Sequence, residues 1–258
     1  MTHTPSYRRM LHKLGYYDYQ RGLVYRHLNQ DAGWFGHEKN SRNFILRAVN
    51  LLKPEKITIL GSGWLLDLPV AELAERSMQI RLVDIFHPPE VRSQTAGFRN
   101  LELVEEDITG GLIEEVWKKA GKSTFLNRMT TLKEIIIPDY EPADSPGMVI
   151  SLNILTQLEV LPLTFLRKKT RADKNEFEIF RQQVQKKHLD FLRRHTSLLL
   201  TDTAEKITHS SGIVSEIPSV VIDLPAGRLR ENWQWDFDLK GIDYNRKRSV
   251  MEVTGIIL

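Results

Sequence analysis

The sequence has no cysteine among its 258 residues. Without thiols the chain cannot form a disulfide, a cysteine-ligated zinc site, an iron–sulfur cluster or a thiol nucleophile. It also lacks a His-x-x-x-His pair and a compact group of carboxylates, so no metal site is predicted. Hydroxyl, carboxylate, amide and imidazole groups are left to carry the chemistry.

Long hydrophobic runs are missing too. The most apolar long window, residues 148–166, is interrupted by Asn153, Gln157, Glu159 and Pro162, which argues against a membrane span. The N-terminal residues are polar and rich in tyrosine, and they lack the apolar core of a signal peptide. We therefore expect a cytoplasmic protein without a membrane partner.

The sequence has only a small excess of positive charge. It contains 36 Lys and Arg and 33 Asp and Glu, so its formal net charge is +3. Two short basic runs, 167–171 and 246–248, have no interleaved aromatic residues of the kind that bind RNA. Nucleic acid is therefore the less favoured partner. The hydrophobic share of 41% and the charged share of 27% are typical of a soluble globular protein.

Short apolar runs, each followed by a turn and a helical pattern, recur along the chain. Runs of this kind are typical of buried parallel strands, and they are found at 57–60, 79–83, 101–104, 148–152 and 197–201. Near the C-terminus, strict alternation over 233–239 and an apolar run over 250–258 indicate two adjacent antiparallel strands. We predict an α/β fold with a seven-stranded, mostly parallel sheet, one antiparallel strand near the C-terminus, and helices on both faces.

The N-terminal fifty residues have apolar side chains at helical spacing. We expect residues 1–53 to form an N-terminal helical cap, and residues 54–258 to form the domain that holds the sheet. The polar stretch 110–147 has no pattern that assigns its structure.

A glycine turn, Gly61-Ser62-Gly63, stands between the first predicted strand and a helical segment. Glycine lets a backbone approach a ligand closely, and a helix N-terminus offers free N–H groups. Leu66 occupies the third glycine position of a dinucleotide fingerprint, which disfavours an NAD-dependent oxidoreductase. A tight turn with no ligand is the structural alternative.

Acidic residues follow the next two predicted strands. Asp84 ends the second strand, 21 residues after Gly63, and Asp107 follows the third. At the carboxyl edge of a parallel sheet, such carboxylates can accept hydrogen bonds from ribose hydroxyls and from the amine of adenine. Each alone could be a strand end or a helix cap, but their order after the glycine turn indicates a ligand crevice at this edge.

With these features the chain resembles the class I methyltransferases that use S-adenosylmethionine. The resemblance is carried, in the expected order, by the segments ITILGSGWLLDLP, QIRLVDIF, LVEEDITG and MVISLNILTQL. It covers roughly residues 56–258, although after residue 161 only the pattern matches.

The resemblance implies that S-adenosylmethionine is the cofactor. Asp84 would hold the ribose hydroxyls, Asp107 and Ile108 would flank the adenine, and Asn153 would lie near the transferable methyl group. The complete set of expected cofactor-binding residues is Gly61, Ser62, Gly63, Asp67, Asp84, Ile85, Asp107, Ile108 and Asn153.

The glycine turn also departs from that family. Ile59 stands where an acidic residue is usual, and Leu65 replaces a small residue. We expect Asp67 to hold the methionine end instead, with a helix N-cap as its alternative role. These departures leave a second hypothesis open, a non-catalytic module of the same fold that binds a protein or RNA partner.

The pattern Gly-Ser-Gly-x-Leu-x-x-Leu-Pro is also similar, over this one loop, to nicotianamine synthases. Transfer of an aminocarboxypropyl or aminopropyl group from the same cofactor is therefore an alternative to methyl transfer.

The segment 151–158 resembles small-molecule methyltransferases more than the enzymes that methylate nucleic-acid amines, with Gln157 at a position where histidine is common. Our catalytic candidates are His37, Asn153 and Asp202, and a structural cap is the alternative role of Asp202. We predict methyl transfer by in-line displacement to an unidentified small molecule, and the sequence leaves the oligomeric state open.

Overall fold

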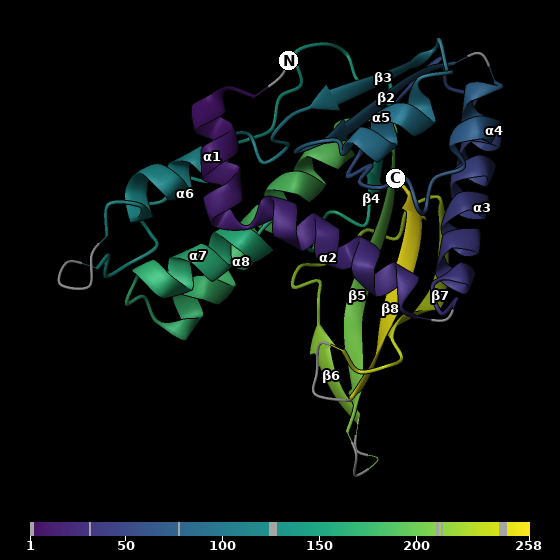
Figure 1. Ribbon diagram of the computed structural model, residues 1–258. Helices are drawn as coiled ribbons and strands as arrows, with labels where there is room; N and C mark the ends of the chain where they lie inside the picture. Colours follow the sequence, from purple (N-terminus) through teal and green to yellow (C-terminus); the bar gives the residue numbers. More distant parts are fainter. Residues whose placement is uncertain are drawn as a thin grey trace.

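The computed structural model describes residues 3–30, 32–76, 78–123, 128–209, 212, 214–242 and 247–258. They form one eight-stranded sheet in which the order is β3-β2-β1-β4-β5-β8-β7, with β6 paired to β5 off this path (Figure 1). The strands are β1 (Lys56–Leu60), β2 (Gln79–Asp84), β3 (Leu101–Glu105), β4 (Met148–Leu152), β5 (Ser197–Thr208), β6 (Val214–Pro218), β7 (Leu229–Asp238) and β8 (Arg248–Ile257).

The directions of the strands confirm the predicted fold class. Strands β1 to β5 are parallel to one another, whereas β8 is antiparallel to both of its neighbours, β5 and β7. On this path β8 is therefore the one reversed strand, as predicted. Strand β6, which the prediction did not include, is antiparallel to the outer half of β5.

Helices cover both faces of the sheet (Figure 1). One face carries α3 (Phe35–Leu52), α4 (Val70–Ala74) and α5 (Pro89–Thr95). The other carries α6 (Leu112–Ala120), α7 (Val160–Lys169) and α8 (Lys174–Arg193). Neighbouring strand residues such as Ile59 and Leu60 enter different core clusters, because successive side chains of a strand point to opposite faces. Burial on both faces explains why these strands are continuous apolar runs.

The N-terminal region is helical, and its helices lie in two places. Helix α1 (Pro5–Leu14) packs against Ile113 of α6, and α2 (Tyr16–Leu28) lines a cavity at the carboxyl ends of the central strands. Helix α3 instead packs on the sheet, where Phe44 lies over Gly255 of β8. A Cβ at Gly255 would lie 2.7 Å from the Phe44 ring, so only glycine lets the helix approach this closely.

Three further expectations concern the stretch 110–147, the second basic run and the lack of a membrane span. The stretch 110–147 contains α6, and Leu132, Ile135 and Tyr140 from its second half join the core. Arg246, in the second basic run, lies outside the described residues. Among the described helices, none has both the length and the apolar character needed to cross a membrane.

Candidate functional site

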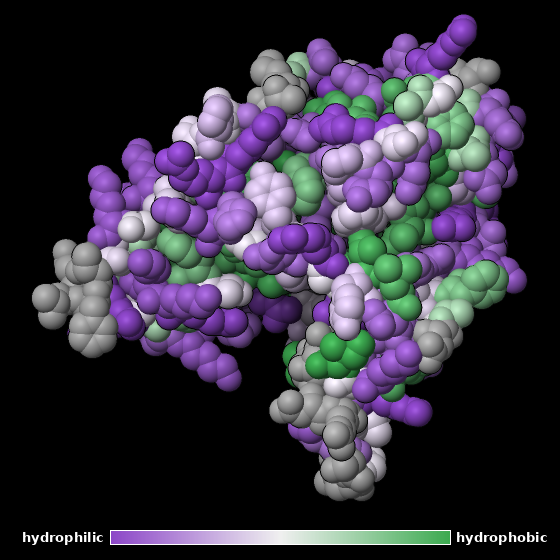
Figure 2. Space-filling model, viewed as in Figure 1, coloured by the Kyte–Doolittle hydropathy of each residue, from purple (hydrophilic) through white to green (hydrophobic). Residues whose placement is uncertain are grey.

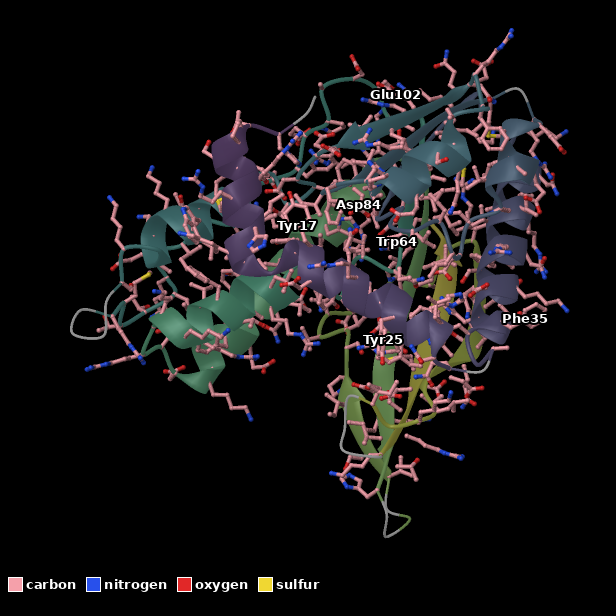
Figure 3. All side chains as sticks on the ribbon, viewed as in Figure 1. Tyr17, Tyr25, Phe35, Trp64, Asp84 and Glu102 are labelled. Carbon is pink, nitrogen blue, oxygen red and sulfur yellow. The ribbon has the colours of Figure 1, made fainter. Side chains whose placement is uncertain are left out.

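A cavity lies at the carboxyl ends of the central strands, between the sheet and helix α2. It contains about 1120 Å³ of empty space, which includes a part open to solvent. Every residue that the sequence placed at the cofactor lines it: Gly61, Ser62, Gly63, Asp67, Asp84, Ile85, Asp107, Ile108 and Asn153. In Figure 3, Asp84 and Trp64 lie close together beside α2, whereas Tyr25 and Phe35 are at the outer surface. The structure therefore brings residues from four strand ends into one cavity.

The glycine turn has a backbone that only glycine accommodates at its first position. Gly61 has a φ of +79°, and a Cβ there would lie 2.8 Å from the carbonyl oxygen of Leu152. Its N–H donates to the carbonyl of Val83 at 2.9 Å, which anchors the turn to the end of β2. Leu65, which follows the turn, is also in the left-handed region, with a φ of +64°.

Asp84 connects the glycine turn, strand β2 and helix α2. Its Oδ2 accepts the N–H of Gly63 at 2.8 Å, and its Oδ1 accepts the Ile85 N–H at 2.8 Å and the Gln20 side-chain amide at 2.7 Å. Burial raises the pKa of Asp84 to about 6, although these hydrogen bonds oppose the rise. The carboxylate thus organises the centre of the cavity.

Helix α2 contributes lining residues that the sequence analysis missed. Tyr16, Tyr19, Gln20 and Leu23 all line the cavity. Their spacing, i, i+3, i+4 and i+7, is that of one helix face, and this was the available signal. The face is largely polar and aromatic rather than apolar, so helical periodicity predicts only a cap for these residues.

Asp107 lies at the end of the cavity beyond β3. Its Oδ1 accepts hydrogen bonds from both the N–H and the hydroxyl of Thr109. Burial raises its pKa, and the hydrogen bonds from Thr109 partly offset the rise. Ile108 adds an apolar wall beside it.

At the opposite end, Asp67 and Asn153 form a hydrogen-bonded pair. The Asn153 side-chain amide donates to Asp67 Oδ2 at 2.8 Å. Burial alone would raise the pKa of Asp67, but attraction to His37, hydrogen bonds from His37 and Asn153, and nearby Arg42 hold it below its ordinary value. In the described part of the chain, Asp67 Oδ1 and Asn153 Oδ1 are both buried without a hydrogen-bond partner. Two acceptor oxygens on residues that line the cavity therefore lack a donor within the described chain.

His37 is fully buried beside this pair and does not line the cavity. Its Nδ1 accepts the indole N–H of Trp233 at 3.1 Å, and its Nε2 lies 3.4 Å from Asp67 Oδ2. An indole N–H only donates, so Nδ1 carries a lone pair; Nε2, which lies 3.2 Å from Asn153 Nδ2 and 3.4 Å from Asp67 Oδ2, then carries a proton that it directs to the carboxylate. We interpret His37 as a positioning residue for Asp67, since neither ring nitrogen is free to take a proton from a substrate.

This tautomer can be tested directly. In nitrogen-detected NMR spectra at neutral pH, we expect His37 to show an unprotonated Nδ1 and a protonated Nε2. Trp233→Phe removes the only donor assigned to Nδ1 and should produce a mixture of tautomers, with a loss of about 1 kcal/mol of stability. Trp117→Phe, in α6, where the ring stacks on Phe165, is the matched control and should leave the His37 signals unchanged. A wild-type ring protonated on Nδ1 would contradict the interpretation.

Asp202 lies away from the cavity. It accepts a hydrogen bond from the Thr156 hydroxyl, next to an irregularity of β5 between Asp202 and Ala204. The described cavity lining does not include it. We propose that Asp202 joins β5 to the loop after β4 rather than contacting a substrate.

Aromatic rings close the end of the cavity next to Asp67. Trp34 and Trp235 both line it, in an edge-to-face contact with centroids 4.7 Å apart. Trp235 also stacks on His37, with centroids 4.0 Å apart and planes 9° from parallel. Sequence reasoning missed Trp235, although the alternation over 233–239 placed three aromatic residues on one face of that strand.

Comparison with known proteins gave fold-level similarities. No protein-family model and no curated protein matches the chain. Three solved structures are similar in shape. A Burkholderia thailandensis 1,6-didemethyltoxoflavin-N1-methyltransferase, with 1,6-didemethyltoxoflavin and S-adenosylhomocysteine bound, is 8% identical with a TM-score of 0.40, over 100% of this chain and 92% of that one. The methyltransferase domain of bacterial CtHen1-CN is 11% identical with a TM-score of 0.34, over 85% of this chain and 99% of that one. DhpI in complex with SAH is 12% identical with a TM-score of 0.36, over 96% of each chain. The assignment of the fold class rests on the strand order described above.

Proposed function

We propose that this protein is an S-adenosylmethionine-dependent methyltransferase acting on a small molecule. The observation that carries the proposal is the single cavity at the carboxyl edge of the sheet. There the glycine turn, Asp84, Asp107 and Asn153 meet, on a sheet whose only reversed strand in the main path is β8. Ligands of open α/β sheets bind at this edge.

The polar groups that line the cavity fit the parts of this cofactor. Asp84 offers a buried carboxylate to the ribose hydroxyls, and Ile108 beside Asp107 offers a wall and an acceptor to the adenine. Asp67 Oδ1 and Asn153 Oδ1 offer two unpartnered acceptors to the ammonium group of the methionine part. Ile59, at the usual acidic position, is fully buried in the core between the sheet and α3, so Asp67 takes over that role in our proposal.

When bound, the cofactor would supply an electrophilic methyl carbon attached to a positively charged sulfur that can leave as a neutral thioether. The chain contributes position and enclosure, with Asp84 and Asp67 holding the two polar ends of the molecule. His37 keeps the Asp67 carboxylate in place, and the acceptor releases its proton to water.

Calorimetry with S-adenosylmethionine and S-adenosylhomocysteine tests the proposal. We expect both to bind with micromolar affinity, and NAD to show no binding at millimolar concentration. Failure of both adenosyl ligands to bind would refute the proposal. In turnover with an acceptor, release of S-adenosylhomocysteine indicates methyl transfer, whereas release of methylthioadenosine indicates aminocarboxypropyl transfer.

The role of Asp67 has its own test. Asp67→Asn keeps the shape of the side chain but removes the charge that faces the ammonium group. It should weaken S-adenosylhomocysteine by about 10- to 100-fold, and should have little effect on the analogue that lacks the α-amino group. Asp202→Asn is the matched control and should change neither affinity. An equal loss for both ligands would show that Asp67 acts on the fold of the loop, not on the ammonium group.

A further inference from the structure

The charged side chains that line the cavity are all acidic. Its described lining includes four carboxylates, Asp67, Asp84, Glu106 and Asp107, and no Lys or Arg. The proposed cofactor brings its own ammonium group to balance its carboxylate, but an acceptor with a net negative charge would bring like charges into a partly desolvated space lined by no Lys or Arg among the described residues. The lining therefore disfavours an anionic acceptor.

The part of the cavity beyond Asp67 is walled by rings and apolar side chains. Trp34 and Trp235 meet edge to face, and Leu23 and Leu66 complete the wall. The Trp235 ring is held from behind by the parallel ring of His37. Fixed aromatic surfaces of this kind favour stacking or edge-to-face contact with another planar ring.

Two residues of the lining have an indole N–H without a partner. The indole nitrogens of Trp235 and Trp64 are buried without a hydrogen-bond partner in the described part of the chain. The Trp34 indole is already used, since it donates to the Phe237 carbonyl at 3.0 Å. An indole N–H only donates, so a ligand atom that contacts Trp235 Nε1 has to be an acceptor.

We propose that the methyl acceptor is an uncharged planar aromatic molecule whose oxygen or ring nitrogen accepts a hydrogen bond from Trp235 Nε1. The inference rests on the proposed function, because it assigns the free oxygens of Asp67 and Asn153 to the cofactor's ammonium group. What remains for the acceptor is ring surface and N–H donors. Its nucleophilic atom forms the bond to the methyl carbon as the carbon–sulfur bond breaks, and its proton passes to water.

Four matched probes test the inference by calorimetry on protein saturated with S-adenosylhomocysteine. 2-Naphthol is neutral and planar, 6-hydroxy-2-naphthoate adds a carboxylate, 2-naphthylmethylamine adds a cation, and decahydro-2-naphthol is saturated. We expect 2-naphthol to bind at least tenfold more tightly than each of the other three. Tighter binding of the amine would indicate a cationic acceptor, and tighter binding of the carboxylate or the saturated alcohol would equally overturn the proposal.

Trp235→Phe keeps a ring against His37 but removes the N–H. It should weaken 2-naphthol by about 3- to 10-fold, the value of one hydrogen bond, with the affinity for S-adenosylhomocysteine unchanged. Trp117→Phe, which packs against Phe165 outside the cavity, is the control and should change neither affinity. If Trp235→Phe does not fold, the four probes on the wild-type protein still decide the question.

The two levels of failure are distinguishable. If S-adenosylhomocysteine itself does not bind, the proposed function fails and the acceptor class fails with it. If S-adenosylhomocysteine binds but none of the four probes does, only the proposed acceptor class is overturned.

Discussion

Asp84→Ala is expected to weaken the binding of S-adenosylhomocysteine by a factor of about 10² to 10⁴. Two ribose hydroxyls that donate to one carboxylate contribute roughly 1.5–3 kcal/mol each, because the acceptor is charged. The variant also frees the Gly63 N–H and the Gln20 amide, which both donate to Asp84. The loss therefore includes the order of the glycine turn as well as direct contact. Calorimetry of the variant beside the wild type measures the effect.

The matched control for Asp84 is Asp202→Ala, which removes a carboxylate from the middle of strand β5. Asp202 contacts Thr156 and does not line the described cavity, so its loss should leave cofactor affinity within about twofold. Thermal unfolding of both variants separates a binding defect from a folding defect. Unchanged affinity in Asp84→Ala would remove the ribose role from the proposal.

The second large effect concerns stability and pH. Glu159 is 1% exposed, and it accepts hydrogen bonds from Gln185 at 2.9 Å and from Arg181 at 3.1 Å. Burial raises its pKa from 4.5 to about 7, although both partners oppose the rise. The folded state therefore holds this proton more tightly than the unfolded chain. The stability that this contributes is fully present below about pH 4.5 and is lost as the pH rises through about 7.

Glu159→Gln removes this titration while keeping an acceptor for Gln185. Relative to the wild type, we expect the variant to gain about 2–3 kcal/mol in the free energy of unfolding between pH 5 and pH 8. Urea unfolding at the two pH values measures the change. Asp84, whose pKa is also raised, contributes equally to the pH dependence of both proteins, so its contribution cancels in the comparison. Glu141→Gln, which removes an exposed carboxylate paired with Arg194, is the control and should show no such gain. Identical pH dependence of wild type and Glu159→Gln would contradict the raised pKa.

The local sequence pattern is sufficient to predict the sheet and the residues at the ends of its strands. Parallel strands are buried on both faces, so β1, β2 and β4 stand out as apolar runs, and the residues after them are found by counting. The outer part of β5 was missed because residues 202–208 are mostly polar, as is usual for a strand that leaves the core. Strand β6, which pairs with that part, was missed for the same reason.

The remaining lining depends on contacts between distant parts of the chain, which local pattern does not contain. Gln20 meets Asp84 across 64 residues, and His37 meets Trp233 across 196. Neither pair has a spacing that periodicity could reveal. Figure 2 shows a further result of this packing, a largely hydrophilic face on which hydrophobic side chains surface near the end of α2, where Leu28 is 73% exposed.

The contact of Phe44 with Gly255 has a consequence for how the molecule assembles. Helix α3, near the start of the chain, lies on β7 and β8, near its end. During synthesis the surface that β7 and β8 offer to this helix is missing until these last two strands have left the ribosome. The contacts that hold His37, and through it Asp67, also come from β7. Such long-range pairing slows folding, so the cavity is completed late, and a nascent chain would expose the apolar side of α3 in the meantime.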